Sequence, residues 1–356
     1  MPDDQQNTIA FLSRPESYGG TGPVERIETH VSLVFLAGER AYKLKRAVRL
    51  PYLDFSTIEQ RRAACAAELA LNRRTAPSLY LELRRIGRNA AGEIGFFENG
   101  AELDWVVIMR RFDQNLLFDA LARAGKLDAP IMDALADHIA EFHAAAESRS
   151  DRGGAAALDA VAGENRRCLS AATRAGFVAK DIDVIAVKWR AAIAANAPLL
   201  EARRQAGKVK RCHGDLHLRN ICLLDGAPLL FDCLEFSEEL AIIDILYDLA
   251  FLLMDLAHRG LGAFANRVLN RYLDRTQEDD GLAALPLFLS LRAGIRAHVT
   301  ATALEQGGDA QMAAEARRYL ELAQTALAPR PPRLVAVGGL SGSGKSTLAA
   351  ALAPEL

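Results

Sequence analysis

The first hundred residues carry short apolar runs of β type and predict a sheet with one inserted helix. Five runs favour strands: 24–27, 31–36, 40–44, 79–86 and 105–109. Between the third and fourth runs, residues 56–59 (Ser-Thr-Ile-Glu) form a capping box that predicts the start of a helix, and Pro77 is expected to stop it. This half of the chain therefore predicts a sheet-based lobe.

From about residue 112 onward, apolar positions recur at the spacing of amphipathic helices. Five stretches show the pattern: 130–147, 181–205, 239–258, 283–305 and 309–327. One β-type segment, residues 212–232, interrupts them. A sheet followed by helices indicates an α+β fold with two lobes. We expect an antiparallel sheet lobe with one helix over 1–111, a mainly helical lobe over 112–328, and a separate segment over 329–356.

Composition and charge narrow the function classes. Of the 356 residues, 50% are apolar and 25% charged, which is typical of a globular protein. The 43 basic and 45 acidic residues give a net charge of −2, so we expect no nucleic-acid partner. No apolar run reaches the ~18 residues needed to cross a bilayer. A polar, acidic N-terminus and five cysteines without a C-x-x-C pair predict a cytoplasmic protein with reduced thiols.

The β-type segment carries the motif with the clearest chemistry, H-x-D-x-x-x-x-N at residues 213–220. Here Asp215 offers a carboxylate for a hydroxyl proton, and Asn220 offers an amide oxygen for Mg²⁺. Two apolar strands follow, joined at 225–226 (Asp-Gly), which is a two-residue hairpin signal. Because a hairpin returns the chain to its start, we expect Asp232 beside Asn220.

This segment resembles the aminoglycoside phosphotransferase group of protein-kinase-like enzymes, which share H-G-D-x-H-x-x-N, a hairpin and a following Asp. The resemblance covers roughly residues 20–325. It implies that Asp215 is the catalytic base, that Asn220 and Asp232 hold Mg²⁺, and that His213 braces the loop. It also implies ATP as the phosphate donor. Only a few residues separate Asp232 from the next helix, so a protein kinase with an activation loop is not expected.

The same resemblance implies a nucleotide site in the first lobe. Two lysines, Lys43 and Lys45, share one face of a predicted strand. Lys43 fits the family's A-x-K form and is favoured for the ATP phosphates, with Lys45 as the alternative. The partner acid implied on the following helix is Glu68. Adenine is expected at the backbone from Arg110 to Phe112, although no G-x-G-x-x-G loop is present.

Charged residues also lie on two predicted helices of the second lobe. Asp244, Asp248 and Asp255 fall on one stripe of residues 239–258. The resemblance makes Asp248 an anchor for backbone amides of the catalytic loop, while the other two either have a structural role or line an acceptor pocket. Arg292 and Arg296 lie one turn apart, and either pair with this stripe or bind an anionic substrate.

Residues 339–346 form a complete P-loop motif, G-x-x-x-x-G-K-[ST], after a predicted strand at 334–337 and before a predicted helix. Its phosphate-binding positions are Gly339, Gly344, Lys345 and Ser346. The chain resembles a subgroup in which the kinase-like domain precedes an ATP-binding P-loop domain, and this implies a domain that continues past residue 356. One strand and one helix cannot bury their own faces, so we expect little nucleotide affinity here.

These features favour an ATP- and Mg²⁺-dependent phosphotransferase that acts on a hydroxyl of a small molecule. The alternative is an ATP-binding regulatory module for a P-loop domain that holds the main activity. Intact Asp215, Asn220 and Asp232 favour the enzyme. Neither the acceptor, which need not be an aminoglycoside, nor the oligomeric state follows from the sequence.

Overall fold

The computed structural model describes residues 2–20, 22–50, 53–329 and 334–353. The chain divides into two compact units. The first combines Met1–Leu121 with Asn220–Ala241, and the second combines Ala122–Arg219 with Ile242–Leu356. Each unit is described by itself. The lobe boundaries expected at residues 111 and 328 stay predictions.

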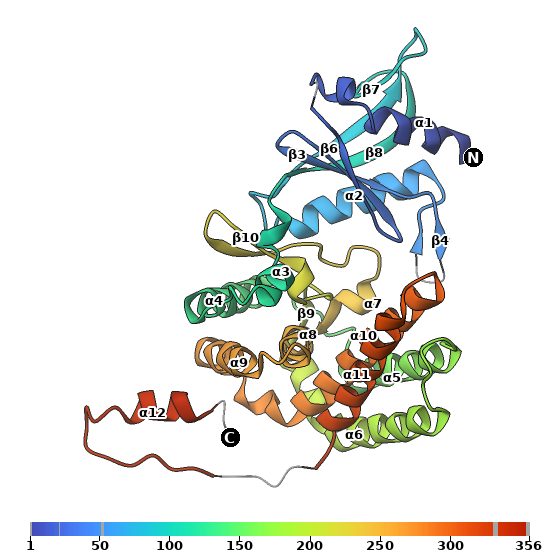
Figure 1. Ribbon diagram of the computed structural model, residues 1–356. Helices are drawn as coiled ribbons and strands as arrows, with labels where there is room; N and C mark the ends of the chain where they lie inside the picture. The colour runs from blue at the N-terminus through green and yellow to red at the C-terminus, as the bar shows by residue number, and fades with distance from the viewer. Residues whose placement is uncertain (1, 21, 51–52, 330–333, 354–356) are drawn as a thin grey trace. The chain divides into compact units, whose positions relative to one another are not determined.

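The first unit contains a six-stranded antiparallel sheet (Figure 1). In spatial order the strands are β1 (Glu25–Glu28), β2 (Ser32–Ala37), β3 (Arg40–Lys45), β8 (Ala101–Arg110), β6 (Tyr80–Arg88) and β7 (Ile94–Gly95). Two helices, α1 (Pro2–Leu12) and α2 (Ile58–Asn72), pack on it. The unit also contains two small hairpins and helix α7 (Glu238–Ala241). One hairpin pairs β4 (Arg49–Leu50) with β5 (Leu53–Asp54), and the other pairs β10 (Ile221–Leu224) with β11 (Ala227–Leu230).

Helix α2 begins one residue later than its sequence suggests. The capping box is formed by Thr57 and Gln60, whose side chains bond each other's backbone amides, so the predicted Ser56–Glu59 box is wrong. The segment Thr-x-x-Gln has the same capping chemistry, and the two possible boxes overlap. The helix ends at Asn72, five residues before Pro77. Helix α1 is an element that the polar N-terminal sequence does not predict.

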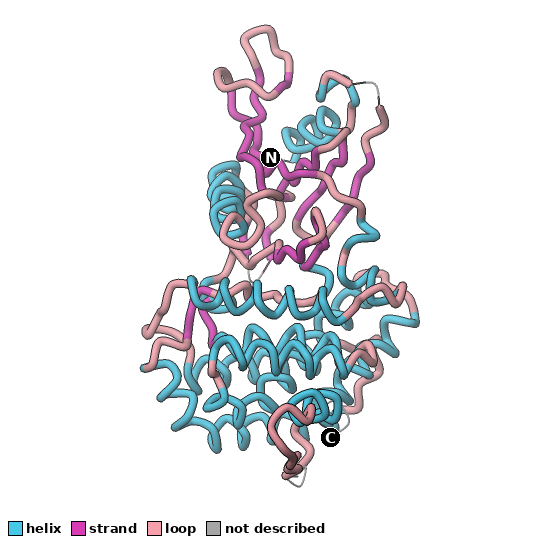
Figure 2. Tube along the Cα trace, turned by 90° about the vertical axis from the view of Figure 1, so that its left-hand side faces the viewer, coloured by secondary structure: helices cyan, strands magenta, loops and turns pink. Residues whose placement is uncertain are grey.

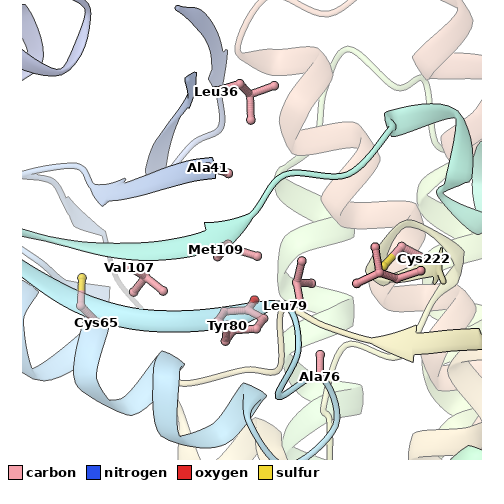
Figure 3. Packing of buried hydrophobic residues seen from close by; sticks show 10 residues of the cluster. Leu36, Ala41, Cys65, Ala76, Leu79, Tyr80, Val107, Met109 and Cys222 are labelled. Atoms are coloured by element: carbon pink, nitrogen blue, oxygen red, sulfur yellow. The ribbon is translucent and has the colours of Figure 1, made fainter. Parts of the chain in front are cut away.

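A hydrophobic cluster links the sheet of the first unit to its second hairpin (Figure 3). Ala41 on β3 is paired with Met109 on β8, and both side chains are buried. Cys222 and Leu224 of β10 belong to the same cluster. A bridge between Leu117 and Cys222 adds backbone pairing. Because this burial is shared, the hairpin that ends at residue 230 is fixed to the sheet.

The second unit is mainly helical (Figure 2). Its main helices are α4 (Ala129–Ala145), α5 (Gly154–Ala171), α6 (Ala179–Gln205), α8 (Ile245–His258), α9 (Gly262–Thr276), α10 (Leu285–Glu305) and α11 (Ala310–Ala326). Helix α8 is buried almost all round and packs against α9 and α10. Residues 279–305, which include α10, are long and apolar enough to cross a bilayer, but half of their apolar window is buried inside the protein. This burial is typical of a core helix.

Two predicted elements of this unit are wrong. Residues 239–258 do not form one helix, because strand β12 (Ile242–Asp244) pairs with β9 (Val209–Arg211) and Asp244 then caps α8. Cross-strand pairing here overrides the helical pattern. Residues 334–340 contain no strand, so the expected strand of the P-loop unit is absent from the described segment 334–353. A strand needs a neighbour for its backbone hydrogen bonds, and that segment supplies none.

Candidate active site

In the first unit, Lys43 lies between two carboxylates. Its Nζ atom is 2.8 Å from Glu68 Oε1 and 2.5 Å from Asp232 Oδ1. These partners come from helix α2 and from the segment after the hairpin. Burial opposes the charge of Lys43, but Asp232 and then Glu68 outweigh it and raise the pKa of Lys43 well above its ordinary value. The lysine is therefore a fixed cation.

Lys45, two residues further on β3, makes a second set of ion pairs. Its Nζ atom is 2.5 Å from Glu68 Oε2 and also contacts Glu235. Lys45 is 1% exposed. Two lysines thus face three carboxylates, which leaves one excess negative charge in the cluster. Burial and the repulsion of Glu68 raise the pKa of Glu235, although Lys45 opposes this.

Helix α2 also holds the backbone that carries Asp232. The amide of Cys233 donates to Asn72 Oδ1 (2.9 Å), and Asn72 lies one turn after Glu68. The amide of Asp232 donates to Tyr80 Oη (3.2 Å). Sequence reasoning missed Asn72, Tyr80 and Glu235. The spacing of four residues between Glu68 and Asn72 was the available signal, because such residues share a helix face.

The hairpin places its two ends side by side, as the sequence predicts. Asp225 and Gly226 both have positive φ values, 52° and 80°, which fit a two-residue turn between antiparallel strands. The amide of Phe231 donates to the carbonyl of Asn220 (2.9 Å). The direct neighbour of Asn220 is therefore Phe231, one residue before the Asp232 that the sequence predicts there.

The backbone after β8, where adenine is expected, borders a groove of about 790 Å³ in the first unit. The amides of Arg110 and Arg111 are already bonded to the carbonyls of Leu79 and Glu39, each at 2.8 Å. Among the described hydrogen bonds, the Phe112 amide has no acceptor. Phe112 is thus the residue of the expected segment whose amide is free to bind a ligand. The Arg110 side chain instead pairs with Asp225.

In the second unit, a buried carboxylate organises the loop that contains Asp215. Asp248 accepts hydrogen bonds from the amides of His213 (3.0 Å) and Gly214 (2.9 Å). The expectation that Asp248 anchors this loop is confirmed. Asp248 also contacts Nε2 of His143 (3.1 Å), whose Nδ1 atom is bonded to Tyr272 Oη (2.9 Å), and lies 3.9 Å from the Arg292 guanidinium. His143 is buried, as its apolar helix face suggests, but it belongs to a polar network.

Two histidine rings fix the candidate base. His213 Nδ1 accepts the amide of Asp215 (3.3 Å), and His217 Nδ1 accepts the amide of Arg219 (3.2 Å). Since Nδ1 of His217 is an acceptor, its proton is on Nε2, which lies 3.3 Å from Asp215 Oδ2. Burial opposes the charge of Asp215, but His217 and then Arg296 lower its pKa. Asp215 is therefore ionised at neutral pH.

The other two acids of the predicted stripe have structural partners. Asp255 accepts the amide of Leu218 (3.0 Å) and pairs with Arg259 (3.1 Å). Asp244 is bonded through both oxygens to Arg203 (2.8 and 2.9 Å). Of the two roles left open by the sequence, these contacts favour the structural one.

The P-loop motif is partly formed. Helix α12 (Lys345–Leu352) begins inside the motif, with Gly344 as its N-cap at φ 80°. The Nζ atom of Lys345 donates to the carbonyl of Leu340 (2.6 Å), while Ser346 is exposed and Gly339 has φ 157°. No side chain of α12 is buried. The described segment thus keeps the turn and the helix of a P-loop without the strand that supports one.

The structure brings Lys43, Glu68 and Asp232 together in the first unit, and it places Asp215 and His213 on one anchored loop in the second. Their catalytic and binding roles stay predictions.

A curated relative aligns with most of this chain. An uncharacterized protein of Mycobacterium tuberculosis is 32% identical over 332 residues, which cover 92% of this chain and 64% of that protein. The chain therefore spans less than two thirds of the length of that curated relative.

Solved structures share the fold. A choline kinase from Cryptosporidium parvum aligns with a TM-score of 0.58 and 12% identity over 90% of this chain and 95% of its own. A choline/ethanolamine kinase family protein from Mesorhizobium loti aligns with a TM-score of 0.56 and 17% identity over 91% and 95%. Aminoglycoside phosphotransferases are also among the similar structures. The α+β fold of a sheet lobe and a helical lobe, expected from the sequence, is confirmed, whereas a P-loop domain is not shown.

The family profile described as "Phosphotransferase enzyme family" matches residues 105–285, which include the anchored loop, the hairpin and helix α8. Because this match covers half of the chain, the protein belongs to the phosphotransferase enzyme family.

Proposed function

We propose that this protein is an ATP- and Mg²⁺-dependent phosphotransferase that transfers the γ-phosphate to a hydroxyl of a small molecule. The observation that carries the proposal is the position of Lys43, which contacts both Glu68 and Asp232. A lysine fixed by an acid and lying beside a second, partly exposed acid is suited to bind nucleotide phosphates next to a metal ion.

The residues present fit a magnesium ion. Asn220 and Asp232 offer amide and carboxylate oxygens, which are the donors that Mg²⁺ prefers. The side chain of Asp232 is 42% exposed and belongs to a cluster with one excess negative charge. A bound Mg²⁺ would supply neutralisation of phosphate charge. Lys43 then holds the α- and β-phosphates, and the Phe112 amide is available for adenine.

The second unit supplies the group for the acceptor. Asp215 is ionised, and the proton on Nε2 of His217 holds its carboxylate in one orientation. A carboxylate fixed in this way orients the acceptor hydroxyl and takes its proton as the phosphoryl group is transferred. Choline and ethanolamine kinases act on hydroxyl compounds as their names state, and we extend that reaction class to this chain as a proposal.

The test measures ADP release from ATP and Mg²⁺ with a panel of hydroxylated metabolites. We expect Asp215→Asn to lower turnover by about 10²–10⁴-fold while nucleotide binding persists. Asp232→Asn should instead weaken Mg²⁺-dependent ATP binding, and EDTA should reproduce that loss in the wild-type protein. Asp183→Asn, on an exposed part of α6, is the matched control.

Equal turnover in wild type, Asp215→Asn and Asp232→Asn would overturn the proposal. ATP binding without acceptor-dependent ADP release would support the alternative, an ATP-binding regulatory module.

A further inference from the structure

Helix α10 carries two arginines, Arg292 and Arg296, one turn apart and in different environments. Arg292 is buried and donates to the carbonyls of Tyr247 (3.1 Å) and Gly214 (3.2 Å). Its guanidinium also packs on the rings of Tyr247 and Phe251, at 3.9 and 4.6 Å from their centroids. The remaining nitrogen, Nη2, has no hydrogen-bond acceptor among the described residues but lies 3.9 Å from Asp248 Oδ1, so the charge of Arg292 is paired within the protein.

Arg296 is half-buried but has no comparable set of partners. Its guanidinium lies 5.6 Å from the ring centroid of Tyr319 on α11, and the Tyr319 hydroxyl is its neutral hydrogen-bonding neighbour. Within the described part of the chain, no carboxylate oxygen lies within 4.0 Å of Arg296. A partly buried charge without a counter-ion is costly unless something else pairs with it.

The nearest acids do not fill that role. Asp215 faces His217, and Asp255 is bonded to Arg259 and to the amide of Leu218. Both acids still influence Arg296 at longer range. Burial opposes the arginine charge, but Tyr319, Asp215 and Asp255 raise its pKa. The unpaired cation therefore lies in the field of the candidate base.

We infer that Arg296 binds an anionic group, a carboxylate or a phosphate, that the acceptor carries besides its hydroxyl. The inference rests on the proposed function and adds the substrate class. A guanidinium forms two parallel hydrogen bonds to either anion, and its charge is never lost at physiological pH. The same charge repels a cationic acceptor, so Arg296 selects against aminoglycosides and choline.

The first experiment compares acceptors that share a hydroxyl scaffold and differ in charge. ADP release is measured with two anionic acceptors, gluconate and glucose 6-phosphate, with neutral glucose and with cationic glucosamine. Anionic glycerate and neutral glycerol form a second comparison, and choline is a further cationic acceptor. We expect an anionic member to be used with at least about 10-fold higher kcat/KM than its neutral and cationic counterparts.

The second experiment changes Arg296. Arg296→Gln should raise KM for the anionic acceptor by about 10- to 100-fold, with a smaller change in kcat and in KM for ATP. Arg296→Lys keeps the charge and should show a smaller rise in KM for the anionic acceptor. This variant also controls for misfolding. Arg296→Glu should shift preference toward glucosamine. Arg190→Gln, an exposed arginine on α6, is the control.

Each failure has a distinct meaning. Turnover of neutral or cationic acceptors alone would overturn the anionic class and leave the phosphotransferase standing. A rise in KM for ATP in Arg296→Gln, without one for the acceptor, would reassign Arg296 to the nucleotide. If no acceptor of any charge releases ADP, the inference and the proposed function both fail.

Discussion

The charged groups of the first unit and those of the second are held by opposite means. In the first, Lys43 and Lys45 are balanced by three carboxylates, so side chains fix one another. In the second, Asp248 is bonded to two backbone amides and a buried histidine ring. An ion-pair cluster with excess charge can exchange a partner for a ligand, whereas an amide-anchored loop is set before any ligand arrives.

A substitution at Asp248 tests this difference between the two units most directly. Asp248→Asn removes a buried charge that holds the amides of His213 and Gly214, and it offers one acceptor oxygen where two are used. We expect a loss of about 3 kcal/mol in the free energy of unfolding. Turnover should fall more than about 10-fold, since the loop of Asp215 loses its anchor. Chemical denaturation and ADP release measure the two effects.

Asp183→Asn serves again as the exposed control for Asp248→Asn. Unchanged unfolding and turnover in Asp248→Asn would show that the loop is fixed by other contacts.

A second pair of variants separates the two lysines of β3. Lys45→Met leaves Glu235 and one oxygen of Glu68 buried without a cation, and we expect a loss of about 3 kcal/mol in unfolding free energy. Lys43→Met also leaves one oxygen of Glu68 without a cation, but its other partner, Asp232, has a side chain that is 42% exposed, so the loss should be smaller. ATP binding should show the reverse order, with Lys43→Met the weaker binder. Thermal unfolding and ATP titration of both variants test the assignment.

A double variant tests whether the loss of stability in Lys45→Met comes from the unpaired charge of Glu235. Adding Glu235→Gln to Lys45→Met removes the orphaned carboxylate and should restore part of the stability. If Lys45→Met weakens ATP binding more than Lys43→Met, then the phosphate-binding role belongs to Lys45.

The sequence predicted those parts of the site that depend on local pattern. Strand alternation placed Lys43 and Lys45 on one face. The Asp-Gly turn predicted Asp232 beside Asn220, and in the structure Phe231, one residue earlier, is bonded to Asn220. Contacts between distant segments were not predictable, because nothing local marks Glu235 as the partner of Lys45. The interruption of the predicted helix 239–258 by strand β12 was not predictable for the same reason, because β12 forms by pairing with the distant strand β9.

The smallest expected effect is in the P-loop segment, where the described residues provide neither an ion-pair cluster nor a loop anchored through its backbone amides. Lys345 has only the carbonyl of Leu340 as its described partner, and neither an acid nor a strand fixes the loop. A P-loop binds phosphate when its amides are held in a concave array, and residues 334–340 provide no strand to hold them. Lys345→Ala should therefore change ATP affinity by less than about twofold, while Asp232→Asn lowers it strongly. A second saturable ATP site that disappears in Lys345→Ala would show that the motif binds nucleotide on its own, without the buried ion pairs that the first unit uses.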